Sequence, residues 1–374
     1  MYRAEVFSFV AGATLFVLSL MTFSLEACTS WMLFPDVTGG NLVILHKNRD
    51  SQSRDVAVRK GFDKNGRVWL GMGGKKGFAM AVNSSGLAGV MNGGEKCTDN
   101  SKNPDGKHTP VLLEEIISTC DTAEQAVKML EDFLKKGDYN HGESGSIFFF
   151  ADTKEGYLAE FTANFFVAQK CSTGYVARAN IWHHPGLAKY ATTDYHTYAI
   201  ESTREYVVRE AINNALAARG KVDVKDILDL SRKTDTPHPI IRRSVCCSWT
   251  NSASTFAVDR EYPDVLTTAY LLVGAARHTV QLPFPICIDE IPEELASGKV
   301  SAASYNRLKE LKHTAEIPAE WLAFEKSASD EYAKSLAQAK ELMKSGKKSE
   351  AVKVLNASFK NIWQKAKALP GLLK

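Results

Sequence analysis

The strongest constraint on the fold is a run of short apolar segments separated by turn residues, between position 29 and about position 274. These segments are rich in β-branched and aromatic side chains, which predicts strands rather than helices. Polar turns with a glycine, such as the one at positions 83–86, separate several of them. The candidate strands are residues 30–34, 41–47, 56–60, 78–82, 87–91, 146–151, 157–161, 165–169, 175–180, 255–258 and 266–273.

Two helical blocks interrupt the strands. The second block has a Ser202/Glu205 capping box, which predicts that its helix begins there. The predicted helices are residues 122–136, 203–219 and 224–231. Two stacked antiparallel sheets with helices on both outer faces would bury so many strands, so the sequence predicts an α+β, four-layer αββα sandwich over residues 28–290.

The character of the chain changes beyond about position 290. Alanine, lysine, glutamate and leucine dominate this part, at helical spacing. We predict a helical C-terminal extension of residues 291–374 that packs on the sandwich. Its expected helices are residues 302–313, 328–345 and 349–368.

The N-terminal segment reads as an export signal. Residues 6–25 are almost continuously apolar, and the segment ends on the small residue Ala27. Residues 1–27 are therefore predicted to be a signal peptide, which places the mature protein outside the cytoplasm, secreted or periplasmic. Two alternatives stay open: an uncleaved membrane anchor, because 20 apolar residues can span a bilayer, and a lipoprotein site, in which Cys28 is lipidated and the protein stays membrane-anchored.

Cleavage after Ala27 would leave Cys28 as the first residue. Its thiol and its α-amine would then lie on one residue, as a nucleophile with its own base. The amine titrates near ~7.7–8.0 and a free thiol near ~8.5, so the amine can accept the thiol proton close to neutral pH.

Composition excludes several classes of function. A net charge of +3 argues against nucleic acid as the main partner, and 44% apolar with 24% charged residues is ordinary for a globular protein. No second apolar run approaches membrane length, so we expect no stable membrane insertion after processing. An assembly of identical copies stays open.

We expect neither a metal nor a cofactor. The seven cysteines show no zinc-ligand spacing, and the histidines at 108, 141, 183 and 184 form no i,i+4 pair. No dinucleotide or phosphate-loop motif occurs, and the glycine-rich stretch at 71–74 is predicted to be a turn.

Several short motifs follow one another along the chain. They are Cys–Thr–Ser at 28–30, Lys–Asn–Arg–Asp at 47–50, the hairpin at 82–92, Phe–Phe–Phe–Ala–Asp at 148–152, Gly–Tyr–Leu–Ala–Glu at 156–160, Ala–Asn at 179–180 and Ser–Thr–Arg at 202–204. In this order the motifs resemble those of the N-terminal nucleophile (Ntn) hydrolases. They are similar to the group around penicillin acyltransferase, with choloylglycine hydrolases, acid ceramidase and cysteine dipeptidases as relatives.

The resemblance implies a role for each matching residue. Cys28 is the nucleophile, and Asp50 positions its amine. Lys47 falls where the superfamily usually has arginine. Asn92 contacts the substrate or the oxyanion, and Asn180 completes the oxyanion hole; Arg204 supports the nucleophile electrostatically. Local alternatives exist, since Asn92 begins an Asn–Gly–Gly turn signal and Asn180 could cap a turn.

The predicted function is a secreted cysteine amidohydrolase or acyltransferase that acts on a small amide or short peptide through a Cys28 thioester. Two other functions stay open: a cysteine dipeptidase of the same superfamily, and a lipid-anchored binding protein with a blocked Cys28. The sequence does not identify the substrate.

Overall fold

The computed structural model describes residues 28–75, 77–99, 103–140, 142–235, 244–312 and 314–374. The predicted signal peptide, residues 1–27, lies outside the described residues, and so does His141.

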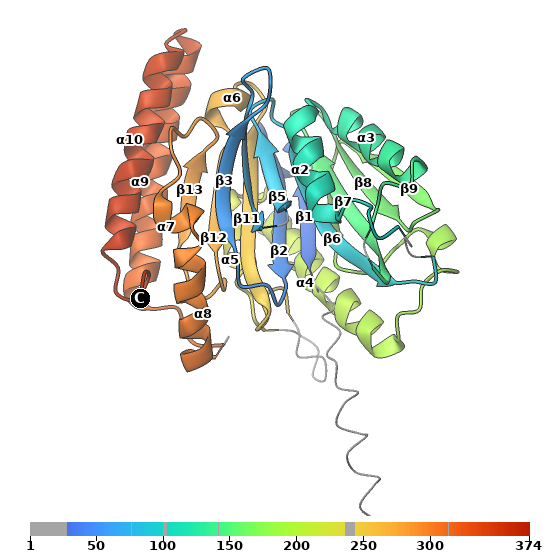
Figure 1. The fold of residues 1–374 in the computed structure, drawn as a ribbon. Coiled ribbons are helices and arrows are strands. Elements are labelled where there is room, and N and C mark those ends of the chain that lie inside the picture. Colours follow the sequence, from blue (N-terminus) through green and yellow to red (C-terminus); the bar gives the residue numbers. More distant parts are fainter. Residues whose placement is uncertain (1–27, 76, 100–102, 141, 236–243, 313) are drawn as a thin grey trace, which may run out of the picture.

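Two antiparallel sheets form the centre of the molecule (Figure 1). The six-stranded sheet has the order β10-β1-β2-β11-β12-β13, and the seven-stranded sheet runs in sequence from β3 to β9. The strands of the first sheet are β1 (Thr29–Leu33), β2 (Leu42–Asp50), β10 (Tyr175–Arg178), β11 (Thr250–Asp259), β12 (Thr268–Val273) and β13 (Gln281–Pro285). Those of the second are β3 (Ala57–Phe62), β4 (Val68–Gly74), β5 (Gly77–Asn83), β6 (Ala88–Lys96), β7 (Ser144–Ala151), β8 (Gly156–Phe161) and β9 (Phe166–Cys171).

Helices cover the outer face of each sheet. α2 (Thr109–Thr119) and α3 (Ala123–Lys135) pack on the seven-stranded sheet, where side chains such as Leu113 and Phe150 share one hydrophobic cluster. α4 (Tyr195–Arg219) and α5 (Val224–Leu230) pack on the six-stranded sheet over Trp31 and Ile44. The predicted α+β, four-layer αββα sandwich is therefore confirmed.

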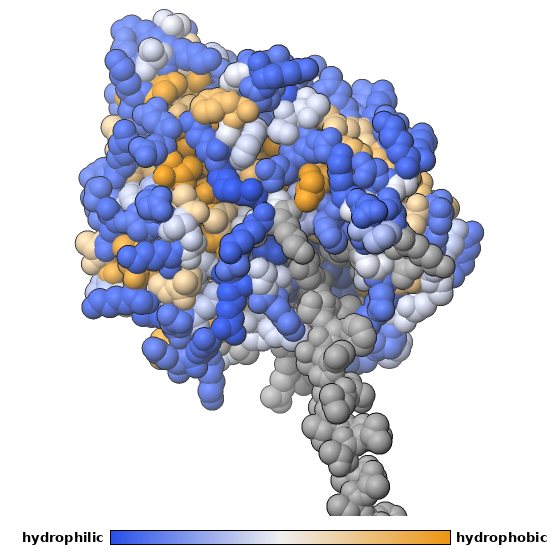
Figure 2. Space-filling model, viewed as in Figure 1, coloured by the Kyte–Doolittle hydropathy of each residue, from blue (hydrophilic) through white to orange (hydrophobic). Residues whose placement is uncertain are grey.

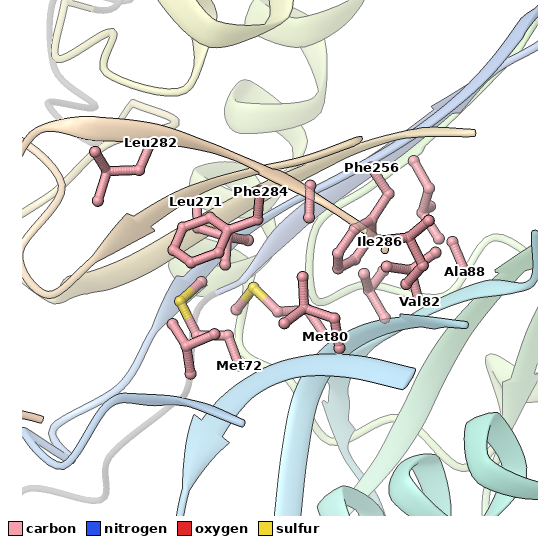
Figure 3. Close-up of a cluster of buried hydrophobic side chains, with 14 of the residues drawn as sticks. Met72, Met80, Val82, Ala88, Phe256, Leu271, Leu282, Phe284 and Ile286 are labelled. Carbon is pink, nitrogen blue, oxygen red and sulfur yellow. The ribbon is translucent and has the colours of Figure 1, made fainter. Parts of the chain in front are cut away.

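The inner faces of the two sheets meet in an apolar core (Figure 3). Met72, Met80 and Val82 of the seven-stranded sheet face Phe256 and Leu271 of the other sheet. All five side chains are almost completely buried. Burial on this scale supplies the main stabilisation of the sandwich, at roughly 1.5–3 kcal/mol for each large apolar side chain.

The C-terminal extension packs along the edge strand β13 (Figure 1). Phe359 lies against Phe284 of β13, with ring centroids 4.6 Å apart, and Tyr332 contacts Thr268 of β12. The remaining helices are α1 (Pro35–Thr38), α6 (Pro263–Leu266), α7 (Glu293–Ala296), α8 (Lys299–Leu311), α9 (Ala319–Lys344) and α10 (Lys348–Lys367), with a 3-10 turn at Pro185–Leu187.

Several elements were not predicted, among them β4, β13, α2 and the short helices α1, α6 and α7. The glycine-rich stretch at 71–74 is part of strand β4, so its prediction as a turn was wrong. A Cβ at Gly71 would lie 2.7 Å from the Phe78 ring, which explains glycine in a strand. Strand β13 contains two prolines, which only an edge strand tolerates. Helix α2 begins with Pro110 in its first turn and has no side-chain cap.

The capping-box prediction for the second helical block was wrong. α4 begins at Tyr195, and Asp194 caps it by accepting from the Thr197 amide at 3.0 Å. The Ser–Thr–Arg motif at 202–204 therefore lies inside the helix. In the extension, α9 begins at Ala319, before the predicted residue 328, and Pro318 is its N-cap residue.

Hydrophilic side chains predominate on the face shown in Figure 2, and hydrophobic ones form small separate groups. Within the described part of the chain, no helix has the length and apolar character required to cross a bilayer.

Candidate active site

Cys28 immediately precedes β1, a strand flanked by β10 and β2. Thr29 pairs with Asn48 and Ser30 with Lys47, so β2 runs back past Cys28 and ends at Asp50. Cys28, Lys47 and Asp50 are all buried. The hairpin β1–β2 thus positions all three residues at one end of the six-stranded sheet.

Arg204 links Cys28 to Asp50. One guanidinium nitrogen donates to the Cys28 carbonyl oxygen at 3.3 Å, and the other donates to Asp50 Oδ2 at 2.6 Å. The Arg204 and Asp50 side chains are fully buried. Burial alone would lower the pKa of Arg204, but the Asp50 and Glu201 carboxylates raise it above its ordinary value, so the guanidinium stays charged.

Asp50 has a second partner. The Thr250 hydroxyl, at the start of β11, donates to Asp50 Oδ1 at 2.5 Å. The Cys247 amide in turn donates to the same hydroxyl oxygen at 2.8 Å. Both carboxylate oxygens of Asp50 are therefore held in fixed hydrogen bonds.

Lys47 and Asn92 form a second polar group on the inner faces of the two sheets. The Lys47 ammonium donates to the Met91 carbonyl at 2.5 Å and to Asn92 Oδ1 at 2.9 Å. The Ser30 hydroxyl donates to the same Asn92 oxygen at 2.7 Å. Asn92 pairs with Ile147 inside strand β6, so the alternative that it begins a hairpin turn was wrong.

Asn92 also contacts the last residue of β10 and the chain segment that follows it. Its amide nitrogen donates to the carbonyl oxygens of Arg178 and Ala179, at 3.3 and 3.1 Å. Asn92 therefore ties β1, β2 and this segment together from the opposite sheet.

Asn180 lies in that segment, two residues after β10. Its side-chain nitrogen donates to the Gly93 carbonyl at 2.7 Å, and its backbone amide donates to Glu201 Oε2 at 3.3 Å. Glu201 Oε2 also accepts from Arg204 at 3.0 Å. The buried Glu201 carboxylate thus connects Asn180 to Arg204 and, through it, to Cys28 and Asp50.

Buried carboxylates bind the backbone on both sides of Asn180. The Ala179 amide donates to Glu205 at 2.9 Å and the Trp182 amide to Glu95 at 3.0 Å. Glu160 accepts from the amides of His183 and His184. Burial raises the pKa of Glu95. Carboxylates from β6, β8 and α4 therefore fix the conformation of residues 179–184.

The structure brings the six predicted site residues together through buried hydrogen bonds. Cys28, Asp50 and Arg204 form one connected set, Asn180 joins it through Glu201, and Lys47 contacts Asn92. Sequence reasoning missed Glu201 and Thr250. Glu201 lies three residues before Arg204 on the same helix face, a spacing that could have indicated it; Thr250 carried no local signal.

Histidine side chains near the site have structural partners. His183 Nε2 lies 2.9 Å from a Glu205 carboxylate oxygen, and His184 caps a 3-10 turn. Among the described residues, no group of three or more His, Cys, Asp and Glu side chains could hold a metal ion.

No protein-family model matches the chain, and no curated protein matches it significantly. Solved structures do resemble it. Two crystal structures of conjugated bile acid hydrolase variants from Clostridium perfringens share 12% identity, cover 69% of this chain and 92% of their own, and have TM-scores of 0.44 and 0.46. Penicillin V acylase from Agrobacterium tumefaciens shares 12% identity over 69% of this chain and 86% of its own, at a TM-score of 0.44.

At such identities and TM-scores, the assignment of the fold rests on the sheets and helices of this chain. What the chain does is therefore proposed from its own side chains.

Proposed function

We propose that the chain is an amide hydrolase whose nucleophile is the thiol of Cys28, freed as the first residue by removal of residues 1–27. The observation that carries this proposal is the buried Arg204, which binds the Cys28 carbonyl and the Asp50 carboxylate at once. Burying the Arg204–Asp50 ion pair costs free energy. The presence of this pair therefore indicates a site in which the backbone of Cys28 has to be fixed in position.

The reaction has two steps. The Cys28 amine accepts the thiol proton, and Sγ attacks the carbonyl carbon of the amide. The C–N bond breaks, the α-ammonium returns a proton to the departing nitrogen, and an acyl thioester remains on Cys28. Water then adds to the thioester with the amine as base, which releases a carboxylic acid and restores the thiol.

The neighbouring residues would divide the remaining work. Asp50, fixed by Arg204 and Thr250, would orient the α-amine. Asn180, held by Gly93 and Glu201, would donate to the oxyanion beside the Asn92 region; such a donor contributes on the order of 3 kcal/mol to transition-state stabilisation. The Lys47 ammonium adds a buried positive charge beside Asn92. Transfer of the acyl group to a second amine would use the same thioester.

Intact-mass measurement of the exported protein tests this proposal. We expect a chain that begins at Cys28 and gains one acyl group from a thiol-reactive acyl analogue. Burial raises the pKa of Cys97 and Cys120 to about 11 and that of Cys246 and Cys287 to about 12, so these thiols stay protonated and unreactive near pH 7.

The matched variants are Cys28→Ala and Cys120→Ala. Labelling should disappear in the first and persist in the second. A mature chain that starts elsewhere, a lipid on the Cys28 amine, or labelling that survives Cys28→Ala would each refute the mechanism.

A further inference from the structure

A separate hollow of about 480 Å³ lies between the loop after Asp50 and helix α8. Its walls come from residues 54–57, the end of β4, and the region of α7 and α8 from residue 296 to residue 306. The C-terminal extension therefore supplies one side of this hollow, and the sandwich supplies the other.

The side chains around the hollow are mainly cationic. Arg54, Arg59, Lys75 and Lys299 line it, against one carboxylate, that of Asp55. Arg59 is paired with Glu114 at 3.3 Å. In the described ranges, Arg54, Lys75 and Lys299 form no ion pair, so the hollow keeps a positive charge excess.

Aromatic rings hold the two guanidinium groups in place. Arg59 lies over the Phe78 ring, 4.3 Å from its centroid, and Arg54 lies over the Tyr305 ring at 5.6 Å. A guanidinium that is already oriented loses less entropy when it binds a planar anionic group such as a carboxylate.

Only a short stretch of chain separates the lining of the hollow from the candidate active site. Arg54 follows Asp50 by four residues, so their Cα atoms are at most about 14 Å apart. The intervening loop is fixed by α8, because Ser301 donates to the Arg54 carbonyl at 2.9 Å and Tyr305 donates to the Ser53 carbonyl at 3.4 Å. Asn251, next to Thr250, donates to the same Ser53 oxygen at 2.7 Å.

We propose that this cationic pocket, formed by Arg54, Lys75 and Lys299, binds a carboxylate carried by the substrate away from the scissile amide. This proposal rests on the proposed hydrolase function and narrows its substrate class to anionic amides. It also gives the C-terminal extension a part in substrate recognition, through Lys299 and Tyr305 of α8.

The test compares two arylamides that share one scissile bond: a dicarboxylic acid monoarylamide with its free carboxylate, and the neutral methylamide of the same compound. The processed wild-type protein should prefer the anionic substrate. In the double variant Arg54→Gln/Lys299→Gln, the ratio of kcat/KM between anionic and neutral substrate should fall about fivefold. The wild-type preference should weaken in high salt.

The control variant is Lys64→Gln/Lys326→Gln, which removes two exposed lysines outside the pocket and should keep the wild-type ratio. If both substrates are cleaved and the Arg54/Lys299 variant does not change their ratio, the pocket proposal is overturned while the hydrolase function stands. If neither arylamide is cleaved and Cys28 gains no acyl group from the thiol-reactive acyl analogue, the hydrolase function fails.

Binding of glutarate at low ionic strength tests the pocket independently of turnover. Calorimetry should detect binding to the wild-type protein and weaker binding to the Arg54→Gln/Lys299→Gln variant. No binding, or equal binding by the two proteins, would overturn the pocket even if the protein hydrolyses amides.

Discussion

The residue that most of the site depends on is Arg204, a charge with no exposed surface. It is bound to Asp50, Glu201 and the Cys28 carbonyl. Removing one partner of such a buried pair leaves an uncompensated charge and costs about 3–5 kcal/mol. A loss of activity in an Arg204 or Asp50 variant could therefore come from a lost catalytic role or from unfolding. Other residues separate these two causes better.

Asn180 offers such a test. Replacing it by alanine removes the side-chain donor and keeps the backbone amide that binds Glu201. If the side chain stabilises the oxyanion, Asn180→Ala should lower kcat by about 10²–10³ and leave KM nearly unchanged.

Asn213→Ala is the matched control, since Asn213 lies exposed on α4 and accepts from the Tyr175 hydroxyl. It should retain wild-type kcat. An Asn180→Ala variant that raises KM without lowering kcat would contradict the oxyanion role.

His46 should make stability depend on pH. It stacks on Trp31 and is bound by Thr255 and Asn48. Burial, and secondarily the charge of Lys47, lower its pKa from 6.5 to about 3, although the Asn48 hydrogen bond acts in the opposite direction. The unfolded chain binds the proton first as pH falls below about 6.5, so this residue reduces the free energy of unfolding between pH 6.5 and pH 3.

From pH 7 to pH 5 the expected loss is about 2 kcal/mol from this one histidine. Urea unfolding at several pH values measures it. His46→Gln should flatten the slope, whereas His196→Gln, on the exposed first turn of α4, should keep it. An unchanged slope in His46→Gln would refute the assignment.

Most of the candidate site could be predicted from the order of motifs. Cys28, Asp50 and Arg204 are far apart in the chain, but each falls in a short motif typical of one superfamily. Glu201 was indicated only by its position three residues before Arg204 on α4. Thr250 could not be predicted, because its only signal is the Asp50 oxygen that it binds. Thr250 can bind Asp50 only because β11 lies beside β2 in the folded sheet.

At the scale of elements, the predicted start of α3 was correct, whereas the predicted start of α4 was wrong. α3 begins after Thr122, the first residue of the predicted helix 122–136, and the Thr122 hydroxyl accepts from the Gln125 amide at 3.2 Å. Strand β4 was missed because its glycines give no apolar alternation. Gly71 and Gly73 are required because strand β5 packs closely against them. The local sequence pattern contains no information about this neighbouring strand.

Gly73 shows how strict that packing is. A Cβ there would lie 2.3 Å from the Gly77 carbonyl oxygen and 2.9 Å from the Phe78 Cα, both backbone atoms. Gly73→Ala should therefore destabilise the protein by about 1–3 kcal/mol.

Gly40→Ala is the matched control, because nothing lies within 4 Å of the Cβ that it adds. It should be neutral or slightly stabilising. Thermal or urea unfolding of both variants checks the prediction, and equal stabilities would show that β4 and β5 are less closely packed than described.

At the scale of the whole molecule, the C-terminal extension is continuous with the sandwich. Trp321, Phe359 and Trp363 belong to the same hydrophobic cluster as the residues between the sheets. The sequence predicted helices that pack on the domain. Its boundary near residue 290 stays a prediction, and the shared core indicates that the two parts fold together.

Phe359→Ala tests this coupling. Removing a buried ring that lies against Phe284 should lower the free energy of unfolding by about 3–5 kcal/mol, in one cooperative transition. Leu322→Ala, on an exposed position of α9, should change it by less than about 0.5 kcal/mol. Two separate transitions in the Phe359→Ala variant would instead show that the extension unfolds independently.

The hydrogen bond from Arg204 to position 28 uses the main-chain oxygen, not the thiol. This hydrogen bond therefore does not depend on the side chain at position 28. A Cys28→Ala protein should therefore keep its architecture while losing its sulfur, and should hold an intact amide without consuming it. Co-crystals of that inert form would reveal the natural ligand directly.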